Sequence, residues 1–278
     1  MRGRVLDTAT RPLVMGVLNV TPDSFSDGGL YAGAAAAVER GLEMLAEGAD
    51  LIDVGGESTR PGAAPVAAAE ELRRVLPVVQ ALAAAGAVVS IDTAKAEVAA
   101  VCLGAGAAVV NDVTALGDPG MAGVVARAGA GVVLMHMHGT PRTMQDDPRY
   151  DDVVAEVCAY LAARAQAAIA AGIDPRAIAL DPGIGFGKRL EHNLALLAGL
   201  PRLAALGYPV LVGASRKRFL ADLLGPLPPA ERDDATVAAH TLAVAGGAAI
   251  IRTHSVVAGL QTARVADAIV RAMPASEL

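Results

Sequence analysis

The sequence predicts an α/β fold, a TIM-type (β/α)8 barrel that occupies residues 1–278 as a single domain. Three observations lead to this prediction: eight short apolar runs, a helical segment after each run, and polar residues where each run ends. Strand and helix alternate eight times within about 250 residues, as they do in this barrel. A doubly wound open sheet is the alternative, because a strand count from one sequence is uncertain.

The predicted strands are rich in Val, Ile and Leu. Most of them are continuously apolar, as expected of parallel strands that are buried on both faces. In chain order they are Val14–Val20, Ala49–Gly56, Ala87–Thr93, Ala107–Val113, Gly131–Met137, Ile178–Gly183, Tyr208–Ser215 and Ala248–His254.

The predicted helices are alanine-rich segments between these runs. Several end at a glycine, the usual residue beyond a helix C-terminus. In chain order they are Ala32–Gly48, Val66–Ala85, Lys95–Leu103, Gly120–Ala128, Asp151–Ala171, Glu191–Leu206, Arg216–Leu224 with Asp233–Ala245, and Val256–Met273.

Composition excludes several classes of protein. With 54% hydrophobic and 19% charged residues the chain has enough apolar residues for a large core, and with 23 basic against 29 acidic residues it lacks the basic surplus of a nucleic-acid binder. No apolar run approaches the ~20 residues of a membrane span, and Met1–Pro12 lacks the apolar stretch of a signal peptide. Cys102 and Cys158 lie in alanine-rich helical patterns, so we expect both to be buried free thiols. We therefore expect a cytoplasmic globular protein with no nucleic-acid or membrane partner.

Polar residues stand at the carboxyl end of every predicted strand. In a barrel all those ends open on one face, where active sites lie. One such residue could be only the cap of the next helix, but eight polar ends with acids, amides and bases predict a single site. In chain order they are Asn19, Asp53 with Glu57, Asp92, Asn111 with Asp112, His136 with His138, Asp181, Ser215 with Lys217, and Arg252 with His254.

Loops on the predicted active face carry further signals. Two long polar loops, Gly16–Gly29 and Gly56–Gly62, leave the first two strands. Two of the three phenylalanines, Phe25 and Phe186, lie in loops on this face. Because phenylalanine is normally buried, this placement indicates aromatic contact with a ligand.

The glycine-rich segment Asp181–Lys188 matches neither common nucleotide-binding loop. A phosphate-binding loop has four residues between its glycines and Ser or Thr after its lysine, whereas Arg189 follows Lys188. A dinucleotide-binding fingerprint reads G-x-G-x-x-G, whereas this segment reads G-x-G-x-G. Both types of site are therefore excluded here.

Two pairs of residues share a strand face. His136 and His138 have no third ligand at the spacing of a zinc site, so we expect them to pack and to form hydrogen bonds. Arg252 and His254 also point to one side of their strand, and an Arg–His pair suits an anion such as a phosphate or pyrophosphate.

Several short motifs follow one another in order from about residue 13 to residue 270. They are Gly16–Gly29, Gly55–Gly62, Ser90–Lys95, Asn111–Val113, Leu134–Met137 with Gly139–Pro141, Asp181–Lys188, Gly213–Lys217 and Arg252–His254. Each motif alone is weak, but the ordered set is very specific, and it resembles the dihydropteroate synthase family. The resemblance implies a TIM barrel that joins 6-hydroxymethyl-7,8-dihydropterin pyrophosphate to p-aminobenzoate, giving dihydropteroate and pyrophosphate. It also implies Mg²⁺, a homodimer and sensitivity to sulfonamides.

The resemblance assigns roles to single residues. The pterin positions are Asp92, Asn111, Met135, Asp181 and Lys217. The pyrophosphate positions are Thr59, Arg60, Arg252 and His254. The p-aminobenzoate positions are Phe25, Pro61, Phe186 and Ser215. Asn19 matches the Mg²⁺ position, and Asp27 matches an acidic position that helps the first loop to close. The implied catalytic residues are Asn19, Asp27, Arg60, Lys217, Arg252 and His254.

Two other functions fit part of this pattern. A pterin-binding methyltransferase domain that acts on methyltetrahydrofolate would share Asp92, Asn111 and Asp181, but it would not need the Ser58–Pro61 loop or the cations near the last strands. A non-catalytic pterin-binding paralogue is the other alternative.

The chain departs from the usual family pattern at Ser255, where Asp is common, and at Ala235, where Gly is common. Ser255 immediately precedes the last predicted helix, and Asp and Ser are both strong N-cap residues. We expect its side chain to cap that helix; the alternative is that the usual aspartate orients His254 and that the anion pocket has lost it.

Overall fold

The computed structural model describes residues 6–21, 29–59 and 62–274. Within them eight parallel strands form a closed barrel in chain order, and β1 pairs with β8 through the register Leu13↔Ile250 to Gly16↔Thr253. The strands are β1 (Leu13–Asn19), β2 (Leu51–Gly55), β3 (Val89–Asp92), β4 (Val109–Asp112), β5 (Gly131–Met135), β6 (Ile178–Asp181), β7 (Val210–Val212) and β8 (Ala248–Thr253). The predicted barrel is therefore confirmed, and the open sheet is excluded.

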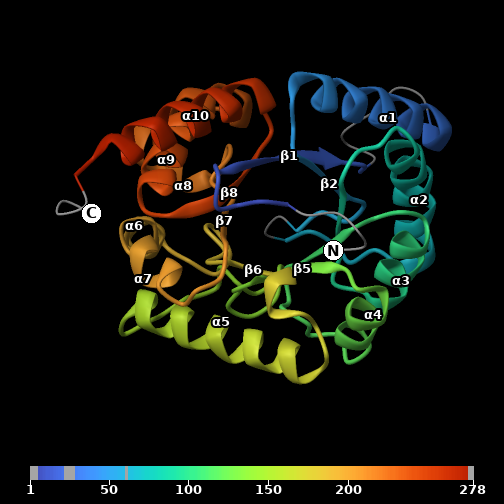
Figure 1. Ribbon diagram of the computed structural model, residues 1–278, viewed down its shortest axis with the longest axis horizontal. Coiled ribbons are helices and arrows are strands. Elements are labelled where there is room, and N and C mark those ends of the chain that lie inside the picture. Colours follow the sequence, from blue (N-terminus) through green and yellow to red (C-terminus); the bar gives the residue numbers. More distant parts are fainter. Residues whose placement is uncertain (1–5, 22–28, 60–61, 275–278) are drawn as a thin grey trace.

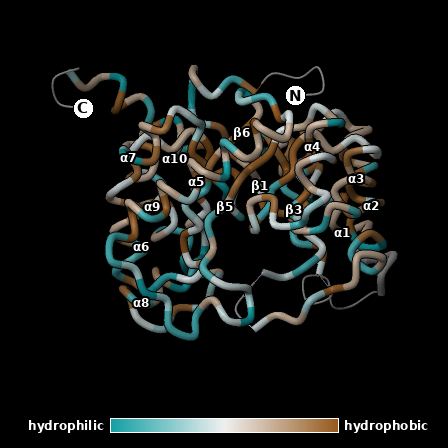
Figure 2. The backbone as a smooth tube through the Cα atoms, turned by 90° about the horizontal axis from the view of Figure 1, so that it is seen from below, coloured by the Kyte–Doolittle hydropathy of each residue, from teal (hydrophilic) through white to brown (hydrophobic). Residues whose placement is uncertain are grey.

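Helices surround the barrel, and Figure 1 shows them as a ring that follows the order of the chain. They are α1 (Gly29–Glu47), α2 (Ala68–Ala84), α3 (Ala96–Gly104), α4 (Met121–Ala128), α5 (Val153–Ala170), α6 (Leu190–Ala198), α7 (Leu200–Ala204), α8 (Arg218–Leu224), α9 (Asp233–Ala245) and α10 (Val256–Ala272). The strands lie inside this ring and are hydrophobic over much of their length (Figure 2).

Most predicted strands are a few residues shorter in the structure, and two predicted elements differ from it more clearly. The helix predicted over Glu191–Leu206 is two helices, α6 and α7, which meet at Gly199. Pro201 lies in the first turn of α7, where its missing N–H is tolerated, but it would break a continuous helix. The strand predicted over Tyr208–Ser215 is only Val210–Val212, and its register against β8 shifts between Val210 and Leu211. Residues 213–215 consequently leave the sheet and are available to the site.

Side chains alternate between the inside and the outside of the barrel, because successive residues of a strand point to opposite faces. A small apolar cluster fills the inside and includes Met15, Leu51, Val133 and Leu211. A larger one lies between the sheet and the helices. The interior cluster closes the barrel below its carboxyl end, so polar residues one step further along the inward-facing positions form the floor of a site.

Helix α5 is long and apolar enough, by length and composition, to cross a membrane, with a mean hydropathy of 1.4 over 18 residues. No second helix in the described ranges passes the same test. Its buried residues, among them Val157, Leu161 and Ala165, belong to the core between barrel and helices. Because helices that pack on a core pass this test too, α5 is weak evidence for a membrane span.

Candidate functional site

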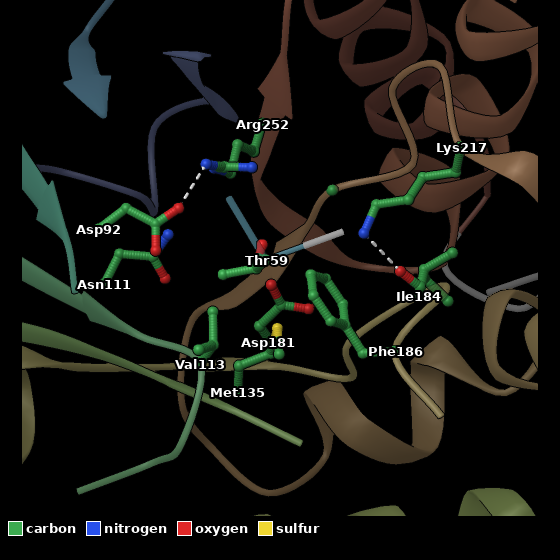
Figure 3. Close-up of a pocket in the computed structure, with 11 residues that line it drawn as sticks. Thr59, Asp92, Asn111, Val113, Met135, Asp181, Ile184, Phe186, Lys217 and Arg252 are labelled. Carbon is green, nitrogen blue, oxygen red and sulfur yellow. Dashed lines mark hydrogen bonds and ion pairs between the residues drawn. The ribbon is translucent and has the colours of Figure 1, made fainter. Parts of the chain in front are cut away.

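A cavity that is partly open to solvent lies at the carboxyl end of the strands. Figure 3 shows carboxylates, an amide and two cations around it, with apolar side chains between them. Its lining residues are Thr59, Asp92, Asn111, Val113, Met135, Asp181, Ile184, Phe186, Gly213, Lys217 and Arg252.

Strand register brings the polar floor of the cavity together. Asp92 lies opposite Asn111 in the β3–β4 pair, and Met135 lies opposite Asp181 in the β5–β6 pair. Asn111, Met135 and Asp181 are each the next inward-facing position above a residue of the apolar interior, and Asp92 follows the buried Ser90 in the same way. The floor is therefore a direct consequence of the two-residue period of four adjacent strands.

A network of charged side chains crosses the cavity from β8 to β2 and β3. Arg252 donates from Nε to Asp53 Oδ2 (2.6 Å) and from Nη2 to Asp92 Oδ2 (2.9 Å). Asn111 Nδ2 donates to the same Asp53 oxygen (2.9 Å). Asp53 is fully buried beneath these residues. One buried carboxylate thus fixes the orientation of both a guanidinium and an amide that face the cavity.

Burial changes the protonation of this network. It raises the pKa of Asp92 to about 7, and the nearby Asp53 charge acts in the same direction, while Arg252 opposes both. Burial alone would lower the pKa of Arg252, but Asp53 and Asp92 outweigh it and hold that pKa above its usual value. Near neutral pH the network therefore gains or loses a proton at Asp92.

Asp181 and Lys217 form the other side of the site. Burial raises the pKa of Asp181, whose Oδ1 accepts a hydrogen bond from the Gly183 N–H (2.7 Å). Lys217 Nζ donates to the Ile184 carbonyl (2.7 Å) and lies 3.8 Å from the centroid of the Phe186 ring. Burial lowers the pKa of Lys217 to about 7, although Asp181 opposes this shift.

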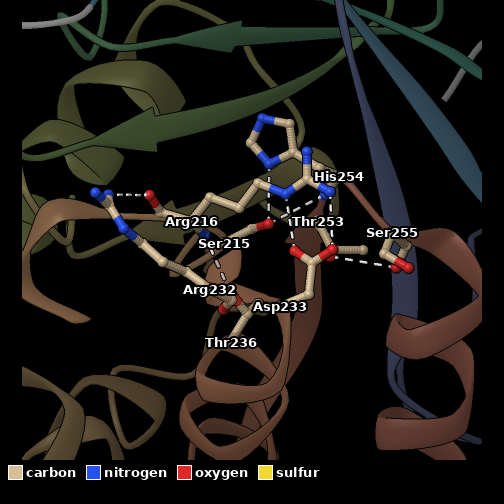
Figure 4. A network of polar contacts seen from close by, with 8 residues as sticks. All are labelled: Ser215, Arg216, Arg232, Asp233, Thr236, Thr253, His254 and Ser255. Carbon is tan, nitrogen blue, oxygen red and sulfur yellow. Dashed lines mark hydrogen bonds and ion pairs between the residues drawn. The ribbon is translucent and has the colours of Figure 1, made fainter. Parts of the chain in front are cut away.

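Ser215 and His254 lie beside each other after β7 and β8. Ser215 Oγ is 2.9 Å from His254 Nδ1, and it accepts a hydrogen bond from the His254 N–H (3.2 Å). The next residue, Arg216, has a φ of +58°, a strained conformation for a side chain with a Cβ. Two hydrogen bonds of 2.8 Å to Asp233 and one from the Arg216 N–H to Thr236 hold it there (Figure 4). Arg216 thus supports the turn that carries Ser215 and Lys217, and its own charge is bound by Asp233.

The structure brings together eight of the residues to which the sequence gave a role. They line the cavity and are Thr59, Asp92, Asn111, Met135, Asp181, Phe186, Lys217 and Arg252. Asn19, at the end of β1, and the Ser215–His254 pair are not among its lining residues. Phe25, Asp27, Arg60 and Pro61 lie outside the described residues.

Not every polar strand end points into the site, so the expectation of eight converging ends is wrong in part. Asp112 faces outward, where its carboxylate accepts hydrogen bonds from Thr114 and from the Leu116 N–H. His136 packs edge-on against Tyr160 and bonds Lys188, and the ring of His138 meets that of Tyr150. His136 therefore packs and forms a hydrogen bond as expected, and His138 packs against a tyrosine ring. The described residues hold no group of three or more His, Cys, Asp or Glu that could bind a metal.

The helix-cap expectation for Ser255 is also wrong in its mechanism. Ser255 does occupy the N-cap position of α10, but its side chain makes no capping hydrogen bond. Its carbonyl oxygen accepts from the Gly259 N–H (3.0 Å) and from Thr253 Oγ1 (3.3 Å). The backbone rather than the hydroxyl therefore starts this helix.

Val113, Ile184 and Gly213 line the cavity although the sequence assigned them no role. Asp53 was expected among the converging strand ends without a specific role, and the structure shows it as the partner of Arg252. For Asp53 the signal was present, because it has the same inward parity on β2 as Leu51. The other three contribute backbone or apolar surface, for which residue type gives no chemical signal.

The chain matches the family described as "Pterin binding enzyme" over residues 15–254. It is similar to the dihydropteroate synthase of Mycobacterium leprae, with 49% identity over 95% of each chain. It is also similar to that of Escherichia coli K12, with 46% identity over 98% of this chain and 96% of the relative.

Solved structures agree with these relatives. A Xanthomonas albilineans dihydropteroate synthase with 4-aminobenzoic acid has a TM-score of 0.91 and 51% identity, over 98% of this chain and 97% of that one. A Yersinia pestis dihydropteroate synthase in complex with a sulfonamide drug has a TM-score of 0.92 and 46% identity, over 98% of both chains. With this fold, this coverage and this identity, the chain belongs to the dihydropteroate synthase family of pterin-binding transferases.

Proposed function

We propose that the cavity at the carboxyl end of the barrel is where this chain condenses 6-hydroxymethyl-7,8-dihydropterin pyrophosphate with p-aminobenzoate to form dihydropteroate and pyrophosphate. The observation that carries the proposal is the joint presence of Asp92, Asn111, Asp181 and Lys217 around one cavity. A pterin presents a flat edge of hydrogen-bond donors and acceptors, and carboxylate, amide and ammonium groups are its complements. A related structure contains 7,8-dihydropteroate, the product of this reaction.

We assign the pterin ring to the floor of the cavity. The Asp181 carboxylate would accept from ring donors, Asn111 would bond the opposite edge, and Lys217 would donate to a ring acceptor. Met135 would pack against the face of the ring with its polarizable side chain.

The departing pyrophosphate needs positive charge and directional donors. Nε and Nη2 of Arg252 already bind carboxylates, so its Nη1 is the group that we assign to pyrophosphate, together with Thr59 and His254. Arg60, outside the described ranges, is assigned there by resemblance. Loss of pyrophosphate leaves a cation on the CH₂ carbon that the pterin stabilises. The arylamine nitrogen then forms a bond to that carbon and gives up one proton to solvent, which leaves the secondary amine of the product. This route needs no protein nucleophile, because the pterin itself stabilises the cation. The protein's part is to bind the charge of the leaving pyrophosphate and to exclude water.

Mg²⁺ is part of the proposal, and Asn19 is its assigned protein ligand. Mg²⁺ binds through one or two protein oxygens together with substrate phosphates, so a single amide oxygen at the end of β1 fits its needs. When bound, it would neutralise charge on the pyrophosphate.

The p-aminobenzoate site is assigned to the mouth of the cavity. Phe186 offers an aromatic surface and Ser215 a hydroxyl on the same side of the barrel. The resemblance adds Phe25 and Pro61 to this site and gives Asp27 a role in the first loop; all three lie outside the described residues. A relative with 4-aminobenzoic acid bound supports this substrate.

A homodimer is also proposed, through α9 and α10. Leu242 on α9, and Val265 and Ile269 on α10, are each more than half exposed, and the last two lie four residues apart on one helix face. A second copy of the chain would cover this apolar surface, as subunit interfaces do. Light scattering should give twice the chain mass for the wild type and the chain mass for Leu242→Asp; a monomeric wild type would contradict the proposal.

Pyrophosphate release separates the candidate functions. With the pterin pyrophosphate we expect release that p-aminobenzoate accelerates, together with dihydropteroate as product. A methyltransferase domain would release none and would bind methyltetrahydrofolate, and a non-catalytic paralogue would bind the pterin without turnover.

A further inference from the structure

Lys188 is a buried cation at the end of the loop that follows β6. Its side chain is only 3% exposed, and no ion pair joins it to a carboxylate within the described residues. Its Nζ lies 2.9 Å from the Phe186 carbonyl, 3.2 Å from the His136 carbonyl and 3.0 Å from His136 Nδ1. Three ammonium hydrogens therefore meet three uncharged acceptors.

Such a cation is costly to bury. Burial lowers the pKa of Lys188 to about 7, with Asp181 opposing the shift and Lys217 adding to it. Burial and the Lys188 charge also lower the pKa of His136 to about 3, so its ring is neutral and Nδ1 can accept the ammonium hydrogen. An apolar side chain would fill this space without the desolvation cost, but it could not bond the two carbonyls.

These bonds join two segments that are already in close contact. Gly183 has a φ of +68°, and a Cβ there would lie 1.9 Å from the His136 carbonyl oxygen. Gly187 has a φ of +62°, and a Cβ there would lie 2.7 Å from the His138 Cβ. Both glycines therefore let the loop after β6 lie directly on the segment after β5. Lys188, which is buried behind this contact, donates a hydrogen bond to a carbonyl of each segment.

The same loop forms one wall of the cavity. Phe186 projects from it toward Lys217, whose Nζ lies 3.8 Å from the ring centroid and bonds the Ile184 carbonyl (Figure 3). The loop is thus held between two lysines: Lys217 within the cavity and Lys188 behind it. Of these two, only Lys217 lines the cavity.

We propose that Lys188 is a positioning residue for the aromatic amine substrate: by binding the Phe186 and His136 carbonyls it fixes the Phe186 ring as the wall against which p-aminobenzoate packs. This assignment rests on the proposed function, because it takes Phe186 as part of the p-aminobenzoate site. Lys188 itself touches no substrate and acts through the Phe186 backbone.

A double-mutant cycle tests this role. In Lys188→Met the ammonium is lost and the side-chain volume is kept. We expect the KM for p-aminobenzoate to rise about tenfold, as loss of a charge-assisted hydrogen bond implies, while kcat and the KM for the pterin pyrophosphate change less than about threefold. Phe186→Leu should raise the same KM. Because both changes act on one wall, the KM of the double variant for p-aminobenzoate should be no higher than that of the more impaired single variant.

Two further variants serve as controls. Lys188→Gln keeps donors for the two carbonyls and should recover part of the affinity for p-aminobenzoate; if Lys188→Met does not fold, the cycle is run with Lys188→Gln. Arg164 also binds loop carbonyls, those of Ala115 and Leu116 (2.7 and 3.0 Å), but in the loop after β4. Arg164→Met should therefore combine additively with Phe186→Leu.

Additive effects of the Lys188 and Phe186 substitutions would overturn the proposal, and so would a folded Lys188→Met enzyme with an unchanged KM for p-aminobenzoate. A uniform fall in kcat with unchanged KM values would also overturn it, since that is the result of general destabilisation. Failure of the proposed function is distinguishable, because in that case the wild-type protein itself would form no dihydropteroate.

Discussion

Arg252 Nε and Asp53 Oδ2 are 2.6 Å apart and join β8 to β2 over the end of β1, which pairs with both strands. The carboxylate that accepts this bond is fully buried and also orients Asn111. Asp53, which does not line the cavity, thus orients Arg252 and Asn111, which do. Its negative charge also raises the pKa of Asp92, so this one side chain links the geometry of the floor to its protonation.

Asp53→Asn should move the acidic limb of the pH profile of kcat/KM. Asp92 is raised to a pKa of about 7 by burial and by the Asp53 charge, so in the wild type it becomes protonated as the pH falls through 7. Removal of the Asp53 charge lowers the pKa of Asp92, and Asp92 then becomes the only charged carboxylate that Arg252 binds. The acidic limb should move to lower pH by about one unit or more, and the alkaline limb should stay in place. An unchanged acidic limb would show that Asp92 does not control it.

Arg252→Lys should lower turnover more than pterin affinity. Lysine keeps the charge but loses the planar fork that binds Asp53 and Asp92 and leaves Nη1 for the proposed contact with pyrophosphate. We expect kcat to fall about tenfold or more, with a smaller change in the dissociation constant of the pterin measured by calorimetry. If kcat at saturating substrate equals that of the wild type, Arg252 does not stabilise the leaving pyrophosphate.

Lys95→Met should destabilise the fold through Glu71. Lys95 bonds the fully buried Glu71 (2.6 Å) and also Glu57, so its loss leaves a buried carboxylate without its cation. Urea unfolding should show a loss of about 3 kcal/mol, and the double variant Lys95→Met, Glu71→Gln should recover most of it. As a control, Arg176→Met removes a fully exposed ion pair with Asp174 and should cost much less stability than Lys95→Met. Equal costs for Lys95→Met and Arg176→Met would mean that the buried pair contributes no more to stability than an exposed one.

Ser255→Ala should be nearly neutral. Ser255 makes no side-chain capping bond, so we expect a cost below about 0.5 kcal/mol rather than the ~1 kcal/mol of a lost cap. Thermal unfolding measures the change in stability, and kcat should stay close to that of the wild type. In Ser255→Asp, a tenfold rise in turnover would show that the anion pocket lacks a carboxylate here.

Strand periodicity accounts for much of what the sequence predicted. The apolar runs located all eight strands, and the place of Asp92, Asn111 and Asp181 at the strand ends predicted that they lie together on one face. What the sequence could not resolve depends on long-range pairing. The bond between Asp53 and Arg252 spans 199 positions, and nothing local to either residue indicates it. Lys188 stood at the end of a rejected nucleotide motif and of a family motif, but its own role was not visible, because two of its partners are main-chain carbonyls.

Calorimetric titration of Asp181→Asn with the pterin substrate tests the assignment of the cavity floor most directly. The substitution replaces an acceptor of ring hydrogen bonds with an amide whose NH₂ faces a donor, at a residue only 6% exposed. Because charge-assisted bonds of ~1.5–3 kcal/mol are involved, we predict a loss of affinity of about tenfold or more, in a protein whose thermal unfolding shows it to be folded. An affinity for the pterin equal to that of the wild type would contradict the placement of the pterin on Asp181.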